Sequence, residues 1–88
     1  MNKYVVSYDL NKEGQRYDLI IHFLERLPIA IKVLESCWLV KTDKSIDELS
    51  DNINTILDSN DEYLVVKFDD FPYGFLYKET IQKINEEF

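Results

Sequence analysis

The sequence predicts a small α+β domain in which a four-stranded antiparallel sheet carries two helices, with one more helix after the last strand. Four short segments alternate apolar and polar residues, which is typical of half-buried strands. Three others repeat apolar residues at three- and four-residue spacing, which predicts amphipathic helices. A chain of 88 residues forms one domain and buries only a modest core, so oligomerisation is expected.

Residues 3–9 form the first predicted strand. Because alternate strand residues point to opposite faces, Tyr4, Val6 and Tyr8 share an apolar face. The other face ends on a carboxylate, Asp9, where the strand meets a turn over residues 11–15. An Asp in this position is a common turn residue and also a common metal ligand.

The first helix is expected over about residues 16–27. Its apolar stripe covers about half the circumference, which indicates that something packs on more than one side of it. Pro28 ends the helix, because the residue before a proline is biased away from helical geometry.

Residues 30–42 form two strands that divide at Glu35 and Ser36, in a bend, bulge or tight hairpin. Trp38 is expected in the core or at a dimer interface. Ser45 and Glu48 match a capping box, which opens a helix running to about residue 57. The last strand covers residues 63–68.

The tail separates a core of residues 1–70 from an aromatic linker and amphipathic helix over residues 71–88. Apolar residues at four- and three-residue spacing predict the helix over residues 77–88. An isolated helix of this length is marginal in water, so it should dock on its own sheet or on a second copy. Five aromatic residues can stack bases, but are expected to fix this helix instead: Phe71, Tyr73, Phe75, Tyr77 and Phe88.

The order strand, helix, strand, strand, helix, strand is that of a ferredoxin-like βαββαβ fold, with both main helices on one face of an antiparallel sheet. Right-handed crossovers place the first and third strands in the centre. Asp9 then lies at the end of a central strand, on the face opposite the helices. A second subunit or the last helix should pack on that uncovered face.

Composition narrows the function. A net charge of −7, from 17 acidic and 10 basic residues, disfavours tight non-specific binding of nucleic acid by a monomer. A single cysteine, Cys37, and a single histidine, His22, exclude disulfide frameworks and multi-cysteine zinc sites. Neither a membrane span nor a signal peptide is apparent, so we expect a cytoplasmic protein without membrane partners.

Three stretches carry a family resemblance. Residues 4–11 (YVVSYDLN) end a strand on an aromatic–Asp pair, residues 34–43 (LESCWLVKTD) begin an apolar strand at a Ser, and residues 58–67 (DSNDEYLVVK) lead into the last strand. Together they resemble the small CRISPR-associated adaptation nuclease family and, more closely, its SinR-like relatives. The virulence-associated protein D toxins are a more distant resemblance.

The resemblance implies a ferredoxin-like homodimer in which Asp9 meets its twin across the two-fold axis and holds Mg²⁺. The implied activity is metal-assisted phosphodiester hydrolysis, by an endonuclease acting on RNA or DNA. Supporting contacts are implied at four further positions: Tyr8, Asn11, Arg16 and Ser36. The sequence departs from the family where the first-strand Asp is usually followed by a basic stretch, because residues 11–16 hold only two basic side chains.

A second interpretation needs no catalysis. The acidic surface of a dimer can engage a basic protein partner or imitate nucleic acid, since strongly charged surfaces attract their opposites. The acidic residues can also serve solubility alone.

Overall fold

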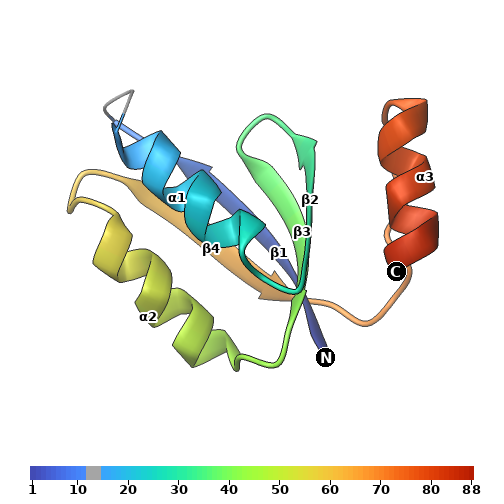
Figure 1. Ribbon diagram of the computed structural model, residues 1–88. Coiled ribbons are helices and arrows are strands. Elements are labelled where there is room, and N and C mark those ends of the chain that lie inside the picture. Colours follow the sequence, from blue (N-terminus) through green and yellow to red (C-terminus); the bar gives the residue numbers. More distant parts are fainter. Residues whose placement is uncertain (12–14) are drawn as a thin grey trace.

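The computed structural model describes residues 1–11 and 15–88, which form a four-stranded antiparallel sheet with helices on both faces (Figure 1). The elements in chain order are β1 (Asn2–Asp9), α1 (Gln15–Glu25), β2 (Ile29–Leu34), β3 (Cys37–Thr42), α2 (Ile46–Ile56), β4 (Glu62–Lys67) and α3 (Lys78–Glu87). The strand order β2-β3-β1-β4 places β1 and β3 in the centre, as predicted. The α+β class is confirmed, while residues 12–14 of the turn expected over residues 11–15 lie outside the described residues, and Gln15 already belongs to α1.

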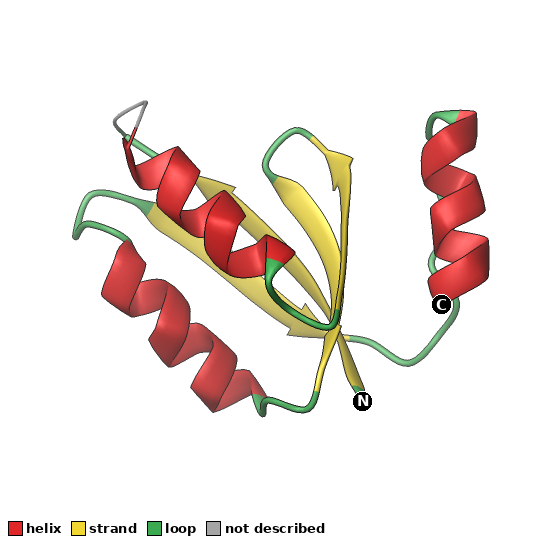
Figure 2. Cartoon of the chain, viewed as in Figure 1, coloured by secondary structure: helices red, strands yellow, loops and turns green. Residues whose placement is uncertain are grey.

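The main core lies between the sheet and the layer formed by α1 and α2, which cover the same face (Figure 2). Tyr4 and Val6 are fully buried there and Tyr8 is nearly so, which confirms the predicted core face of β1. Trp38 also belongs to this core. Both helices contribute fully buried aliphatic side chains, Ile20 and Leu24 from α1 and Leu49 and Ile53 from α2.

The segment between β2 and β3 is a tight hairpin whose turn is formed by Glu35 and Ser36, which is one of the three alternatives predicted at this point. Ser36 has a φ of 57°, a left-handed conformation that side chains other than glycine rarely adopt. The pairing of β2 with β3 also shifts register between Lys32 and Leu34. The turn lies beside the end of β1, because the amide of Tyr8 donates to the carbonyl of Ser36 at 3.0 Å.

Helix α1 ends at Glu25, two residues before the predicted end. A turn follows, in which the amide of Leu27 donates to the carbonyl of Leu24, and Pro28 prevents its continuation. Within one chain, the second side of α1 on which packing was expected is covered only in part, because Leu19 remains 44% exposed. Ile21 and Phe23 are half-buried against the main core.

Helix α2 begins with the predicted capping box. The Ser45 hydroxyl accepts from the amide of Glu48, and the Glu48 carboxylate accepts from the amide of Ser45, at 3.2 and 3.1 Å. The backbone hydrogen bond from Ser45 lowers the pKa of the Glu48 carboxyl, because it favours the ionised form.

We expect the Glu48→Gln substitution to destabilise the protein at neutral pH and to have a smaller effect in acid. The pKa of Glu48 is lower in the folded than in the unfolded state. Its charge therefore stabilises the fold above the unfolded pKa, and this contribution is lost as the pH falls through the folded pKa. Urea midpoints at pH 7 and pH 3 measure this, with the exposed Glu86→Gln on α3 as control. A gap between wild type and Glu48→Gln that is unchanged at pH 3 would contradict the assignment.

Helix α3 packs on the other face of the sheet, over β2, which confirms that the last helix can cover this face within one chain. Ile84 is buried against Ile31 and Leu39. The Phe88 ring stacks on Phe68 with ring centroids 6.1 Å apart. The part of this face over β1 and β4 that α3 leaves uncovered, which we call the open face, carries Ser7, Asp9, Glu62, Leu64 and Val66.

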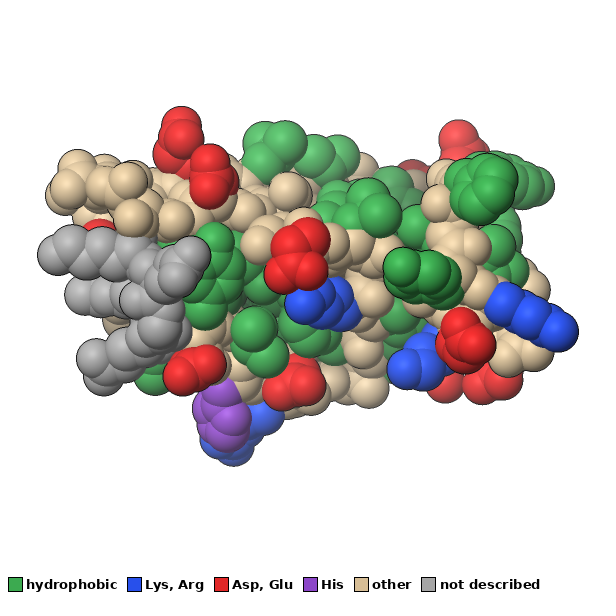
Figure 3. Space-filling model, turned by 90° about the horizontal axis from the view of Figure 1, so that it is seen from above, with side chains coloured by type: hydrophobic (Ala, Val, Ile, Leu, Met, Phe, Trp, Pro, Cys, Tyr) green, Lys and Arg blue, Asp and Glu red, His purple; other side chains and the backbone are tan. Residues whose placement is uncertain are grey.

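The aromatic segment, residues 71–77, corrects a prediction. Of the aromatic residues expected to fix α3, only Phe88 does so. Tyr73, Phe75 and Tyr77 are 93%, 103% and 84% exposed, and Phe71 is 40% exposed. Hydrophobic side chains accordingly gather at the surface around α3, on the right of Figure 3. The even-numbered Pro72 and Leu76 are half-buried, so the aromatic residues occupy the outer side of an extended chain.

Within the described ranges, no helix combines the length and the apolar character that crossing a membrane requires.

Candidate functional site

The end of β1 brings two carboxylates together on the open face. Asp9 is exposed at the last position of this central strand and pairs in register with Glu62, the first residue of β4. Directly opposed residues of antiparallel strands point to the same face, with Cβ atoms about 4.5–5.5 Å apart. Like charges in such a pair destabilise a sheet unless a cation lies between them. Glu62 therefore joins Asp9 as a candidate ligand, although the sequence analysis did not single it out.

A hollow of about 310 Å³ surrounds this pair. Ser7 lies two residues before Asp9 on the same face and pairs with Leu64, so a hydroxyl and an apolar side chain complete the wall. The volume is at the lower end of the range for small-molecule sites. The hollow is broad and open, which suits a group presented by a larger ligand.

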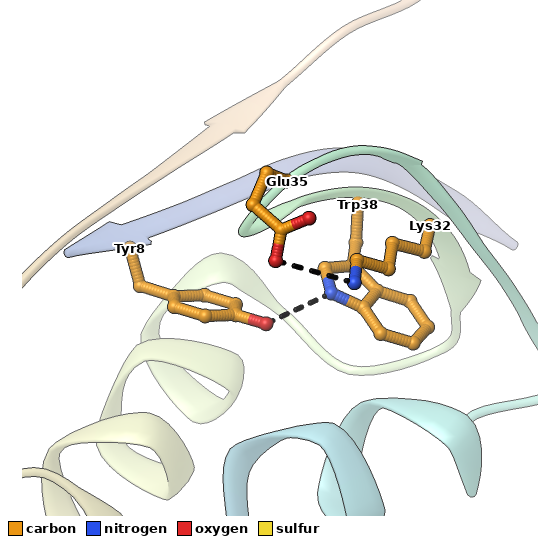
Figure 4. Close-up of polar contacts among 4 residues, drawn as sticks. All are labelled: Tyr8, Lys32, Glu35 and Trp38. Carbon is orange, nitrogen blue, oxygen red and sulfur yellow. Dashed lines mark hydrogen bonds and ion pairs between the residues drawn. The ribbon is translucent and has the colours of Figure 1, made fainter. Parts of the chain in front are cut away.

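The Tyr8 side chain points away from Asp9. Its ring is 6% exposed in the main core, and its hydroxyl accepts a hydrogen bond from the indole nitrogen of Trp38 at 3.0 Å (Figure 4). Burial raises the pKa of the Tyr8 phenol, because the anion would lose its hydration. Tyr8 therefore packs in the main core, on the face of β1 opposite Asp9, whereas the resemblance implied a contact at the site. The same view shows the ion pair of Lys32 with Glu35, at 3.6 Å on the hairpin surface.

Two other predicted supporting residues lie near Asp9 through their backbones. The carbonyl of Ser36 holds the amide of Tyr8, the residue before Asp9. The amide of Asn11 donates to the Asp61 carboxylate at 2.8 Å, and the amide of Asp58 donates to the same carboxylate at 2.9 Å. Asp61 thus ties the loop after β1 to the loop before β4.

Arg16, the fourth predicted supporting residue, lies in the first turn of α1, but its side chain is not among those described.

Cys37 lies on the same face as Asp9 and pairs in register with Ser7. It is half-buried, and burial raises the pKa of its thiol. A protonated thiol is a poor nucleophile, so this environment favours a packing role for Cys37.

The donor set at the hollow suits a hard cation only in part. Nowhere in the described ranges do three acidic, histidine or cysteine side chains gather as a metal cluster. One protomer offers two carboxylates and a hydroxyl. Mg²⁺ is commonly held by one or two carboxylates, because it retains several waters and takes further oxygens from phosphate. The residues present fit Mg²⁺ in that form, and a second Asp9 from a partner copy would strengthen the set.

Comparisons of the chain with protein-family models, with curated proteins and with solved structures find no match.

Proposed function

We propose that this protein is a homodimeric, Mg²⁺-dependent endonuclease of the ferredoxin-like fold that hydrolyses phosphodiester bonds in RNA or DNA. The single observation that supports it most is the pairing of Asp9 with Glu62 in an open hollow at the end of a central strand. The strand order and the placement of α1 and α2 on one face support the finer fold description. The resemblance to SinR-like proteins and the CRISPR-associated adaptation nucleases supports the substrate class.

In this proposal Asp9 and Glu62 hold the cation and Ser7 donates a hydrogen bond to a non-bridging phosphate oxygen. Bound Mg²⁺ would supply charge neutralisation at phosphorus and a more acidic water. The hairpin turn at Ser36 and the buried Tyr8–Trp38 pair keep the end of β1 in place, so the carboxylates need little reorganisation when substrate binds.

The homodimer in this proposal forms through the open face and the aromatic segment. Leu64 and Val66 on the open face are 64% and 44% exposed, and Leu34 at the neighbouring hairpin is 58% exposed. Leu64 and Val66 share one face of β4, and exposed apolar side chains that lie together in this way mark interaction surfaces. A two-fold axis beside the end of β1 would place each Asp9 near its twin at the edge of the interface, where the hollow stays open to a phosphodiester.

We expect the Asp9→Asn substitution to reduce Mg²⁺-dependent cleavage at least tenfold while leaving thermal unfolding nearly unchanged. Asn retains the shape of the side chain but removes the charge that attracts the cation. Mixed RNA and DNA substrates, with Mg²⁺ and with EDTA, test this, and Glu62→Gln should reduce cleavage in the same direction.

Asp18→Asn, which removes an exposed carboxylate on α1, is the matched control and should cleave like wild type. Equal cleavage by wild type and Asp9→Asn would assign the activity to a contaminant or another site.

A second candidate function is an acidic interaction protein with a basic protein partner. The observation favouring it is the excess of 17 acidic over 10 basic residues, which a dimer doubles. No cleavage by a pure wild-type dimer across metals and pH, together with partner capture that is lost at high salt, would favour this function.

A further inference from the structure

A second hollow lies on the opposite side of the molecule from Asp9, between α1 and α2. Its volume is about 420 Å³, within the range of small-molecule sites. Four apolar and three basic side chains line it: Leu19, Phe23, Leu27 and Ile56, with His22, Arg26 and Lys44. It is independent of the proposed nuclease site, because it belongs to the helix layer on the other face of the sheet.

The hollow is elongated. Helices α1 and α2 run in opposite directions (Figure 1), so the end of α2 at Ile56 lies beside Leu19, and the start of α2 lies beside the end of α1. From Leu19 to Glu25, where α1 ends, a helical rise of 1.5 Å gives about 9 Å, and Arg26 and Leu27 follow in the turn. Apolar residues at Leu19 and Ile56 mark one end, whereas Arg26 and Lys44 mark the other.

The charge of this hollow is opposite to that of the protein. Two cationic groups, Arg26 and Lys44, line it beside the imidazole of His22, and no carboxylate does, in a chain of net charge −7. Neither Arg26 nor Lys44 forms a close ion pair with another described residue, although the Lys44 charge, after the hydrogen bonds from Ser45, contributes to the lowered pKa of the Glu48 carboxyl. Basic residues near a helix C-terminus also complement the helix dipole, which accounts for His22 and Arg26. Lys44 comes from a different segment, so the dipole does not explain why it joins them.

At the end of the hollow that carries Arg26 and Lys44, hydrogen bonds from β1 fix the backbone of Lys44. The carbonyl of Lys44 accepts from the Tyr4 hydroxyl at 2.7 Å and from the Asn2 side-chain amide at 3.1 Å. Tyr4 is fully buried, so it fixes the Lys44 backbone to the core. At the other end Leu19 is 44% exposed, on the side of α1 for which the broad apolar stripe predicted cover.

We propose that this hollow between α1 and α2 binds a linear amphiphile with a single anionic head group, such as a medium-chain carboxylate. The head group lies against Arg26 and Lys44, where charge-assisted hydrogen bonds are available. The alkyl chain lies along Phe23, Leu19 and Ile56 and removes their apolar surface from water. An elongated hollow with basic groups at one end matches this ligand in both length and polarity.

Titration of the ¹⁵N-labelled protein with decanoate tests the proposal. Saturable amide shifts are expected at residues 19–27 and 44–56, with one ligand per chain. Arg26→Gln and Lys44→Gln should each weaken binding at least fivefold, and Leu19→Ser should weaken it without changing the head-group contacts. Lys83→Gln on α3 removes an exposed charge elsewhere and should bind decanoate like wild type.

Two partial ligands separate the contributions. Decanol lacks the charge and acetate lacks the chain, so both should bind at least tenfold more weakly than decanoate. Absence of saturable shifts, or equal affinity of wild type, Arg26→Gln and Lys44→Gln, would overturn the proposal. Stronger binding of the protein to vesicles of pure phosphatidylcholine than to dissolved decanoate would also overturn the proposal, because it would indicate a membrane contact instead. None of these readouts depends on nuclease activity.

Discussion

Replacing Trp38 with alanine is expected to lower the free energy of unfolding by about 3–5 kcal/mol, the range for truncating a large aromatic residue in a core. Trp38 is 4% exposed and packs among residues from β1, α1 and α2. Its indole nitrogen also donates to Tyr8, whose buried hydroxyl would lose that partner. A domain of 88 residues has a total stability of about 4–13 kcal/mol, so this one change would leave much of it unfolded.

Urea unfolding followed by circular dichroism measures this loss, because the alanine variant lacks the single tryptophan that gives a fluorescence signal. Trp38→Phe and Tyr8→Phe separate the two contributions. Each retains most of the ring volume but leaves one buried polar group unpaired, at a cost of about 1–3 kcal/mol. A loss below about 1 kcal/mol for Trp38→Ala would mean that the indole does not occupy the core.

The core between the sheet and the helices α1 and α2 was predictable because the spacing of apolar residues in the sequence agrees with the observed burial. In β1 the alternation of Tyr4, Val6 and Tyr8 matches a face that one layer of helices covers completely. The capping box at Ser45 is local, so its residues determine it without any tertiary contact. An interruption of the strand pattern at Ser36 was predictable. Its positive φ was not, because serine has no preference for the left-handed conformation.

The second carboxylate of the candidate site was not predictable in the same way. Glu62 is 53 positions from Asp9 in the chain, and only the register of β1 with β4 brings them together. A shift of one residue in this register would turn Glu62 to the face covered by α1 and α2. The usable signal was the alternation of β4, because Leu64 and Val66 on the open face imply that Glu62 shares it.

The aromatic segment shows where burial cannot be inferred from composition. Phe71, Tyr73, Phe75 and Tyr77 lie at every second position, so an extended chain directs them to one side. The half-buried Pro72 and Leu76 occupy the other side and contact the protein. Hydrophobicity alone predicted burial, but burial requires an opposing surface, and a single chain does not provide one here.

Replacing both Tyr73 and Phe75 with serine is expected to weaken the proposed dimer at least about a hundredfold. Aromatic side chains at the centre of an interface commonly contribute about 2 kcal/mol or more each, and every 1.4 kcal/mol is tenfold in affinity. Both side chains are almost fully exposed in one chain, so their removal should not lower the stability of the folded monomer. Sedimentation equilibrium over a range of protein concentrations measures the change.

Leu19→Ser is the matched control, because it removes an exposed apolar side chain from the opposite layer and should leave dimerisation unchanged. A wild-type protein that stays monomeric at concentrations of about 100 μM would contradict the proposed dimer, since specific complexes bind far more tightly. So would a double variant that dimerises like wild type, because the aromatic segment would then lie outside the interface.

The monomeric double variant also separates the two ways in which the candidate site can be built. Both substitutions leave Asp9, Glu62 and Ser7 untouched on the open face of the same chain. Loss of Mg²⁺-dependent cleavage on dissociation would mean that the cation needs Asp9 from both copies. Retained cleavage by the monomer would mean that the pair formed by Asp9 and Glu62 is sufficient, and that the dimer serves to cover apolar surface. In either case, comparison with Asp9→Asn in the same background shows whether the remaining activity belongs to this carboxylate.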